Sequence, residues 1–319
     1  MISINSRVMP TVRHIIENDA ALGCRAYRLE NGTQVIDMGI EVPGSWEAAR
    51  LFTEIDMGNL ATCSYRNYRI DSDFSAPAVE VYADRLSEAC IASQIAGWKL
   101  KNGDEEAIGS GPARALAAAE GDFYLGYTDY RDTHHEAVLG LQMTSLPTIE
   151  LARDVARQAR VDESNVYLLV HPSRSLVASV QVSGRIIEQT IHQMIQKEFD
   201  VSRLVRARGW CVVAPVTDDE TVSMGRINDS LLYGGEVEFW LRGKDAELEA
   251  LVPRLVTESA RDYGRLFLDL YEEAGRTYYA MDHQIHSPAK VQLFNMTTGR
   301  AFTAGRMRND ILRQSFFQA

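Results

Sequence analysis

Several features are scarce or missing in this chain of 319 residues, and each absence excludes a class of protein. It has no run of about 18 apolar residues, so we expect no membrane-spanning helix. The amino terminus has no basic segment followed by an apolar core, so we expect no secretory signal and, by default, a cytoplasmic protein. The four cysteines lack any CxxC pair, which argues against a zinc ribbon and gives no disulfide framework: Cys24, Cys63, Cys90 and Cys211.

Basic residues are fewer than acidic residues in this chain. Lys and Arg number 33 against 44 Asp and Glu, which gives a formal net charge of −11. Duplex nucleic acid is bound by clustered cations that neutralise phosphates, so we expect no nucleic-acid partner. No Pro/Gly/Ser-rich linker occurs either, so two domains would be closely packed and not tethered. The hydrophobic content of 45% is enough for one large core or two ordinary ones.

Helical and strand patterns are mixed along the chain, which favours an α+β fold over a doubly wound parallel sheet. Asn31-Gly32 and Thr297-Thr298-Gly299 predict hairpin turns. We divide the chain into an N-terminal α/β region over 1–125 and a C-terminal one over 126–319, whose segments could interleave. Helices are predicted over 5–22, 46–57, 85–96, 149–160, 176–195 and 221–232, and strands over 24–29, 33–37, 61–70, 79–83, 137–143, 166–170, 210–216, 236–241, 291–295 and 301–304.

An arginine and a glutamate lie three residues apart inside an apolar helical pattern. Apolar and small residues recur at helical spacing from Leu176 to Ile195, and Gln181, Arg185, Glu188 and His192 follow one edge of this stripe. The spacing of Arg185 and Glu188 lets both side chains reach one small volume. We expect this edge to face a cleft. The alternative is an exposed ion pair, which would contribute only about 0.2 to 0.5 kcal/mol.

A second cluster lies at residues 109–116, GSGPARAL. Its glycine loop, Ser110 and proline predict a helix start running to Glu120, where free N–H groups and Arg114 can hold an anion. Ser110, Gly111 and Arg114 are therefore candidate ligand-binding residues. The cluster is neither a dinucleotide fingerprint nor a P-loop. The alternative is an ordinary helix start.

A third cluster lies at residues 224–235, MGRINDSLLYGG. Arg226, Asn228, Asp229 and Tyr233 offer donors and acceptors to a ligand before a Gly-Gly stop. Asn and Asp also cap helices and form turns, which is the alternative. The HxxH spacing of residues 283–286 resembles a metal motif, but no cysteine or acidic pattern completes it, so we expect no metal site.

Together these clusters, in this order and spacing, resemble the family of methenyltetrahydromethanopterin cyclohydrolases. The motifs are GSGPARAL, SVQVSGRIIE (179–188) and MGRINDSLLYGG. Shorter stretches add to the match from residue 30 to residue 305, so the resemblance covers essentially the whole chain: ENGT (30–33), MGNLAT (57–62), AGW (96–98), YLLV (167–170), APV (214–216), DYG (262–264) and TAG (303–305).

The resemblance implies reversible hydrolysis of the 5,10-methenyl group of a tetrahydromethanopterin-type carrier to the 5-formyl form. It also implies a homotrimer of two closely packed α/β regions, with the pterin in the cleft between them, and no metal or nicotinamide cofactor. Glu188 would move protons, and Arg185 would orient Glu188 or water. The residues predicted to hold the pterin are Ser110, Gly111, Arg114, Gln181, Arg226, Asn228, Asp229 and Tyr233. Two alternatives stay open: a carrier-binding protein without catalysis, and a nicotinamide-dependent dehydrogenase acting on the same carrier. The carrier, intact or dephospho, and the direction of flux also stay open.

Overall fold

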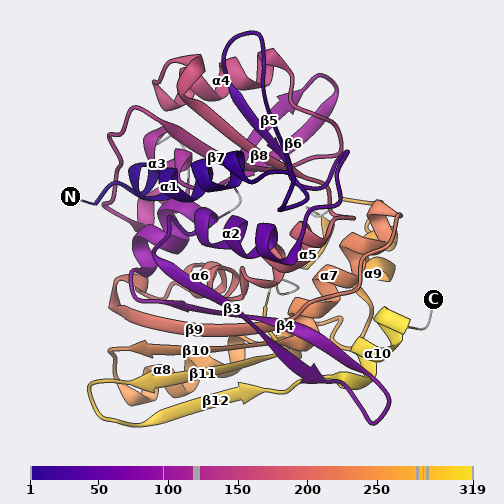
Figure 1. Cartoon of the computed structure of the whole chain (residues 1–319). Coiled ribbons are helices and arrows are strands. Elements are labelled where there is room, and N and C mark those ends of the chain that lie inside the picture. Colours follow the sequence, from indigo (N-terminus) through magenta and orange to yellow (C-terminus); the bar gives the residue numbers. More distant parts are fainter. Residues whose placement is uncertain are drawn as a thin grey trace. The chain divides into compact units, whose positions relative to one another are not determined.

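The computed structural model describes residues 2–95, 97–117, 123–277, 280–282, 284 and 287–317. Two compact units divide the chain, and each combines two separate segments: Met1–Thr62 with Ser87–Gln181, and Cys63–Leu86 with Val182–Ala319. Each unit holds one six-stranded sheet (Figure 1). The α+β fold is therefore confirmed. The expected boundary at residues 125 and 126 falls inside the first unit, because strands that follow it complete the sheet of that unit.

The sheet of the first unit has three parallel strands at its centre and antiparallel strands at both edges. β2, β8 and β7 are parallel neighbours, β1 pairs antiparallel with β2, and β6 and β5 extend the other side as an antiparallel hairpin. In spatial order the strands are β1 (Arg25–Arg28), β2 (Gln34–Asp37), β8 (Val166–His171), β7 (Ala137–Gln142), β6 (Glu105–Ser110) and β5 (Trp98–Asn102).

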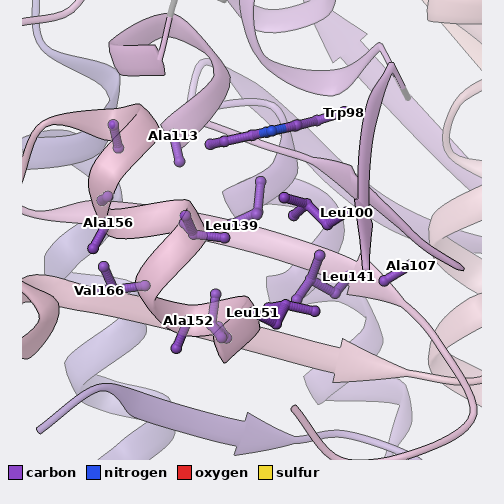
Figure 2. Close-up of a cluster of buried hydrophobic side chains, with 14 of the residues drawn as sticks. Trp98, Leu100, Ala107, Ala113, Leu139, Leu141, Leu151, Ala152, Ala156 and Val166 are labelled. Atoms are coloured by element: carbon purple, nitrogen blue, oxygen red, sulfur yellow. The ribbon is translucent and has the colours of Figure 1, made fainter. Parts of the chain in front are cut away.

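Helices cover both faces of this sheet, because side chains alternate along its central strands. Leu139 and Leu141 of β7 point toward Leu151 and Ala152 of α4 (Ile149–Ala159), as Figure 2 shows. On the other face, a Cβ placed on Gly140 would meet the ring of Phe52 at 2.6 Å. The remaining helical elements are α1 (Ile4–Glu17), α2 (Trp46–Asp56), the π-helix η1 (Ser87–Gln94), α3 (Ala113–Ala117), η2 (Tyr124–Tyr127), η3 (Glu163–Asn165) and α5 (Leu176–Ser183).

The second unit is built on its own sheet. β10 is parallel to β11, while β12 with β11, β9 with β10 and β4 with β9 are antiparallel pairs. In spatial order the strands are β12 (Ala301–Gly305), β11 (Lys290–Asn295), β10 (Gly235–Leu241), β9 (Leu204–Val212), β4 (Ser75–Ala83) and β3 (Ala61–Arg69). Its helical elements are α6 (Ile186–Gln196), η4 (Val201–Arg203), α7 (Glu220–Gly234), α8 (Asp245–Leu251), η5 (Val252–Arg254), η6 (Thr257–Ser259), α9 (Phe267–Glu273) and α10 (Asn309–Phe317).

The structure confirms some predicted elements and corrects others. Both predicted hairpins form, as β1 with β2 and as β11 with β12. The first helix ends at Glu17 and not at residue 22, because Asn18 caps it and donates its amide to the carbonyl of His14 at 2.8 Å. The helix expected over 85–96 is a π-helix over Ser87–Gln94. The strands β5 and β6 and the helices α8, α9 and α10 were not predicted.

All four cysteines are buried and none forms a disulfide. Burial raises the pKa of the Cys24 thiol, helped by the charges of Asp37 and Asp19, to about 12. Burial likewise raises the pKa of Cys211 to about 12. Cys24 and Cys90 belong to the first unit, and Cys63 and Cys211 belong to the second. Over the described ranges, no helix combines the length and the apolar character that crossing a bilayer requires.

Candidate active site

The helix predicted over 176–195 is two helices. α5 ends at Ser183, a turn follows at Gly184 and Arg185, and α6 begins at Ile186. The amide of Arg185 donates to the carbonyl of Val182 at 3.0 Å, three residues back, where a continuous α-helix would bond four residues back. Glycine has a low helix propensity, so Gly184 is a natural place for the break. The predicted edge is therefore interrupted, with Gln181 on α5 and the other three residues at the start of α6 or within it.

Arg185 and Glu188 nevertheless meet, as their spacing predicts. The Nε of Arg185 donates to Oε2 of Glu188 at 3.1 Å. Only 8% of each side chain is exposed. The alternative of an exposed surface pair is therefore wrong. Removing one partner of a buried ion pair leaves the other charge uncompensated, which costs several kcal/mol, so this pair is far more constrained than a surface bridge.

Two glycines of the second sheet set the position of α6. A Cβ on Gly209 of β9 would meet Ile186 at 2.5 Å and Ile187 at 2.9 Å. A Cβ on Gly235, the first residue of β10, would meet Ile186 at 2.5 Å. Gly209 and Gly235 lie on neighbouring strands, which lets the first turn of α6 rest directly on the sheet backbone. This close packing fixes the turn that carries Arg185 and Glu188.

In the first unit, Gln181 lies beside the carboxyl end of β8. Its Nε2 is 3.3 Å from Nε2 of His171, the last residue of that strand, and both side chains are buried. The His171 ring also makes an edge contact with Phe52, with the ring centres 4.9 Å apart. Ligands of open sheets are commonly held at the carboxyl ends of parallel strands. This end of β8 is thus a reasonable place for a substrate contact.

The cluster at residues 109–116 joins the end of β6 to the start of α3 at Ala113, so a helix does begin here. Its predicted end at Glu120 lies outside the described residues. Gly109 and Ser110 end β6, and Ser110 donates its hydroxyl to Oδ1 of Asp56 at 2.8 Å. The amide of Gly111 donates to the carbonyl of Ser93 at 2.9 Å, so it is not a free donor for an anion. Arg114 is 2% exposed, and its Nη1 donates to the carbonyl of Ile91 at 3.0 Å. Its place next to η1 matters because π-helical turns are frequent at functional sites.

In the second unit, all four predicted residues of α7 make hydrogen bonds within that unit. Tyr233 donates to the carbonyl of Arg265 at 2.6 Å and accepts from the amide of Gly264. Arg226 donates to the carbonyl of Ser315 at 3.1 Å, and Asn228 donates to a carbonyl of its own helix. Arg226 and Asn228 are half-buried, whereas Tyr233 is buried.

Asp229 is the most perturbed of these four residues. Its Oδ1 accepts from the amide of Phe267 at 2.8 Å, and its Oδ2 accepts from the hydroxyl of Ser315 at 2.7 Å. Burial raises the pKa of Asp229 to about 7, although both hydrogen bonds act in the opposite direction. The carboxyl group therefore joins α7 to the start of α9 and to the last turn of α10.

Sequence reasoning missed two polar residues in the first unit, Asp56 and His171. A signal for His171 was present, because it follows the predicted strand 166–170 directly and stands before a proline. Asp56 gave no such signal, since its partner Ser110 is 54 residues away. Of the HxxH motif, His283, Ile285 and His286 lie outside the described residues.

Comparison with known proteins identifies the family of this chain. A family model described as Cyclohydrolase (MCH) matches residues 3–316. A methenyltetrahydromethanopterin cyclohydrolase of Methanocaldococcus jannaschii is 37% identical over 99% of this chain and 98% of that protein. The proteins of the same name from Methanococcus vannielii and Methanothermobacter marburgensis are 36% and 34% identical, each over 99% of this chain and over 98% and 99% of their own lengths. The chain belongs to the Cyclohydrolase (MCH) family.

Proposed function

We propose that this protein hydrolyses the 5,10-methenyl group of a tetrahydromethanopterin-type carrier reversibly to the 5-formyl form. The single observation that carries the proposal is the buried contact between Arg185 and Glu188, in a chain of this family. The methenyl carbon lies between two nitrogens that share a positive charge, so it accepts water once a base removes a proton. Glu188 is the base, and it passes the proton to N10 as the bond from that nitrogen to the carbon breaks. The second proton of the water leaves the adduct's hydroxyl group for the solvent as the formyl C=O bond forms.

Arg185 has a positioning role in this scheme. Its Nε donates to Glu188, which fixes the direction of the carboxylate before water arrives. When the adduct collapses and its hydroxyl group loses its proton, negative charge develops on the oxygen that came from water, and a nearby guanidinium stabilises it. No metal ion and no nicotinamide takes part in these steps.

In this proposal the residues that hold the carrier are Gln181, Ser110, Gly111, Arg114, Arg226 and Asn228. Asp229 and Tyr233 support α7 from behind, because their polar atoms bond to Phe267, Arg265 and Gly264. We also propose that the protein acts as a cytoplasmic homotrimer, which sedimentation velocity of the purified protein tests.

The decisive experiment follows the decay of the methenyl chromophore. Glu188→Gln keeps the size of the side chain and removes the base, so kcat should fall by about 100- to 10,000-fold. KM should change much less, because the carrier is held by other residues. Glu198→Gln is the matched control, since Glu198 is an exposed carboxylate just beyond α6, and it should be as active as the parent.

Two outcomes would overturn the proposal. Retained turnover in both Glu188→Gln and Arg185→Ala would show that this pair is not the catalytic one. Binding of the methenyl carrier by the parent protein without decay of its chromophore would identify a carrier-binding protein. Kinetics on the intact and the dephospho carriers then decide which of the two is the substrate.

A further inference from the structure

Three metal-ligating side chains meet on the loop that leads into β7, in the first unit. They belong to consecutive residues, His134, His135 and Glu136, and one ligand atom from each lies within 4.8 Å of the others. Nε2 of His134 is 3.1 Å from Oε2 of Glu136, and the two imidazole rings have their centres 4.3 Å apart. Sequence reasoning did not predict this cluster, because three consecutive residues do not have the spacing of known metal motifs.

The distances suit one zinc ion. Zinc binds imidazole nitrogen at about 2.0 to 2.1 Å and carboxylate oxygen at about 2.0 to 2.2 Å, so two ligands of a tetrahedral site lie roughly 3.4 Å apart. The separation of 3.1 Å between His134 and Glu136 is close to this value. His135 is exposed, so a rotation of its side chain can bring its nitrogen within reach. Water would complete the coordination.

Glu136 is already oriented by its neighbours. Its Oε1 accepts from the hydroxyl of Tyr167 on β8 at 3.1 Å and from Arg13 on α1 at 3.1 Å. Its Oε2 lies 3.1 Å from Nε2 of His134 and accepts a longer bond from Arg13 at 3.5 Å. Carboxylates that bind metals are commonly held by such outer partners. Only 10% of the Glu136 side chain is exposed, whereas 57% of Arg13 is exposed, so the guanidinium can move away from an incoming cation.

We propose that His134, His135 and Glu136 form a binding site for a single divalent transition-metal ion such as Zn²⁺. The ion would replace the proton shared between His134 and Glu136 and would tie the loop to α1 and β8 through Glu136. The site stands at the amino end of β7, whereas Gln142 and the adjacent His171 stand at the carboxyl ends of β7 and β8, across a strand of six residues. Its role is therefore to stabilise the first unit and not to activate water for the hydrolysis.

The test is a zinc titration of protein that carries no histidine tag and has been freed of metal with EDTA. Competition with a chromophoric chelator should show one Zn²⁺ per chain. In the variant His134→Ala/His135→Ala the affinity should fall by at least about tenfold, since two of three protein ligands are gone. Zinc in hundredfold excess over Kd should also raise the thermal midpoint of the parent by about 3 °C or more, and of the variant by much less.

His14→Ala is the matched control, because His14 is another histidine of the first unit, on α1, and zinc affinity should be unchanged. Circular dichroism checks that the double variant is folded. The proposal is overturned if the parent binds zinc only at millimolar concentration, or if the double variant binds as well as the parent. It is equally overturned if binding disappears in His283→Ala/His286→Ala instead.

Discussion

Arg185 and Glu188 show how far a local pattern leads. Their spacing of three residues predicts that the side chains meet, and they do so at 3.1 Å. The spacing does not predict that the pair is buried, because burial depends on residues far along the chain. A buried pair holds one geometry, while an exposed pair of the same spacing would sample many.

Asp229 gives the clearest dependence of stability on pH. Its pKa is about 7 in the folded protein against an ordinary value of 3.8. A carboxyl group with a raised pKa contributes its full stability below the ordinary value and loses it as the pH rises to the folded value. Between pH 4 and pH 7 this group alone should therefore lower the free energy of unfolding by up to about 1.4 kcal/mol per pH unit.

The variant Asp229→Asn isolates this effect. Its amide oxygen can still accept from the amide of Phe267, but it does not titrate. The difference between the thermal midpoints of the parent and the variant (parent minus variant) should fall steadily from pH 4 to pH 7 and should stay constant above pH 7. A constant difference across this range would contradict the raised pKa.

At the scale of elements, the contact between α6 and the second sheet positions Arg185 and Glu188. The sheet contacts α6 at Gly209 and Gly235, so a side chain at either position would push the helix away from the sheet. In Gly209→Ala the new methyl group would meet Ile186 at 2.5 Å. We expect a loss of about 1 to 3 kcal/mol in unfolding free energy, which is typical of overpacking. Turnover should fall as well, because Ile186 lies next to Arg185.

Gly126→Ala is the control for this prediction. A Cβ on Gly126 meets nothing within 4 Å, so stability should stay within about 0.5 kcal/mol and turnover should be unchanged. Denaturant unfolding and the chromophore assay measure both variants. Equal behaviour of the two would show that α6 does not depend on the glycine contact.

Local chemistry explains which elements could be predicted. The hairpin turns depend only on a few neighbouring residues, Asn31-Gly32 and Thr297-Thr298-Gly299, and both predicted hairpins are present. The break at Gly184 competes with a strong apolar stripe on either side, so the pattern predicted one helix. The π-helix at Ser87–Gln94 has no local signal, since its fully buried Ser93 and Gln94 depend on tertiary contacts. The support of α6 requires the register of β9 and β10, which no local pattern contains.

At the scale of the whole molecule, each unit is assembled from two separated segments. The central strands β7 and β8 of the first sheet come after residue 125, and β3 and β4 of the second sheet come before it. A fragment ending at residue 125 should therefore lack a cooperative thermal transition, because the middle of its sheet is missing. A fragment over 126–319 should behave likewise. Scanning calorimetry of the two fragments and of the intact chain tests this prediction. A sharp transition in either fragment would contradict it.

The four cysteines are buried, two in each unit, so their reaction with a thiol reagent can measure how often each unit opens. The thiolate is the reactive form of cysteine and needs access to the reagent, so buried thiols react with an alkylating agent only after the surrounding structure opens. Timed alkylation followed by peptide mass spectrometry would thus record, from one sample, how often each unit opens. The alkylation rate of Cys24 and Cys90 would give the opening rate of the first unit. The alkylation rate of Cys63 and Cys211 would give the opening rate of the second unit.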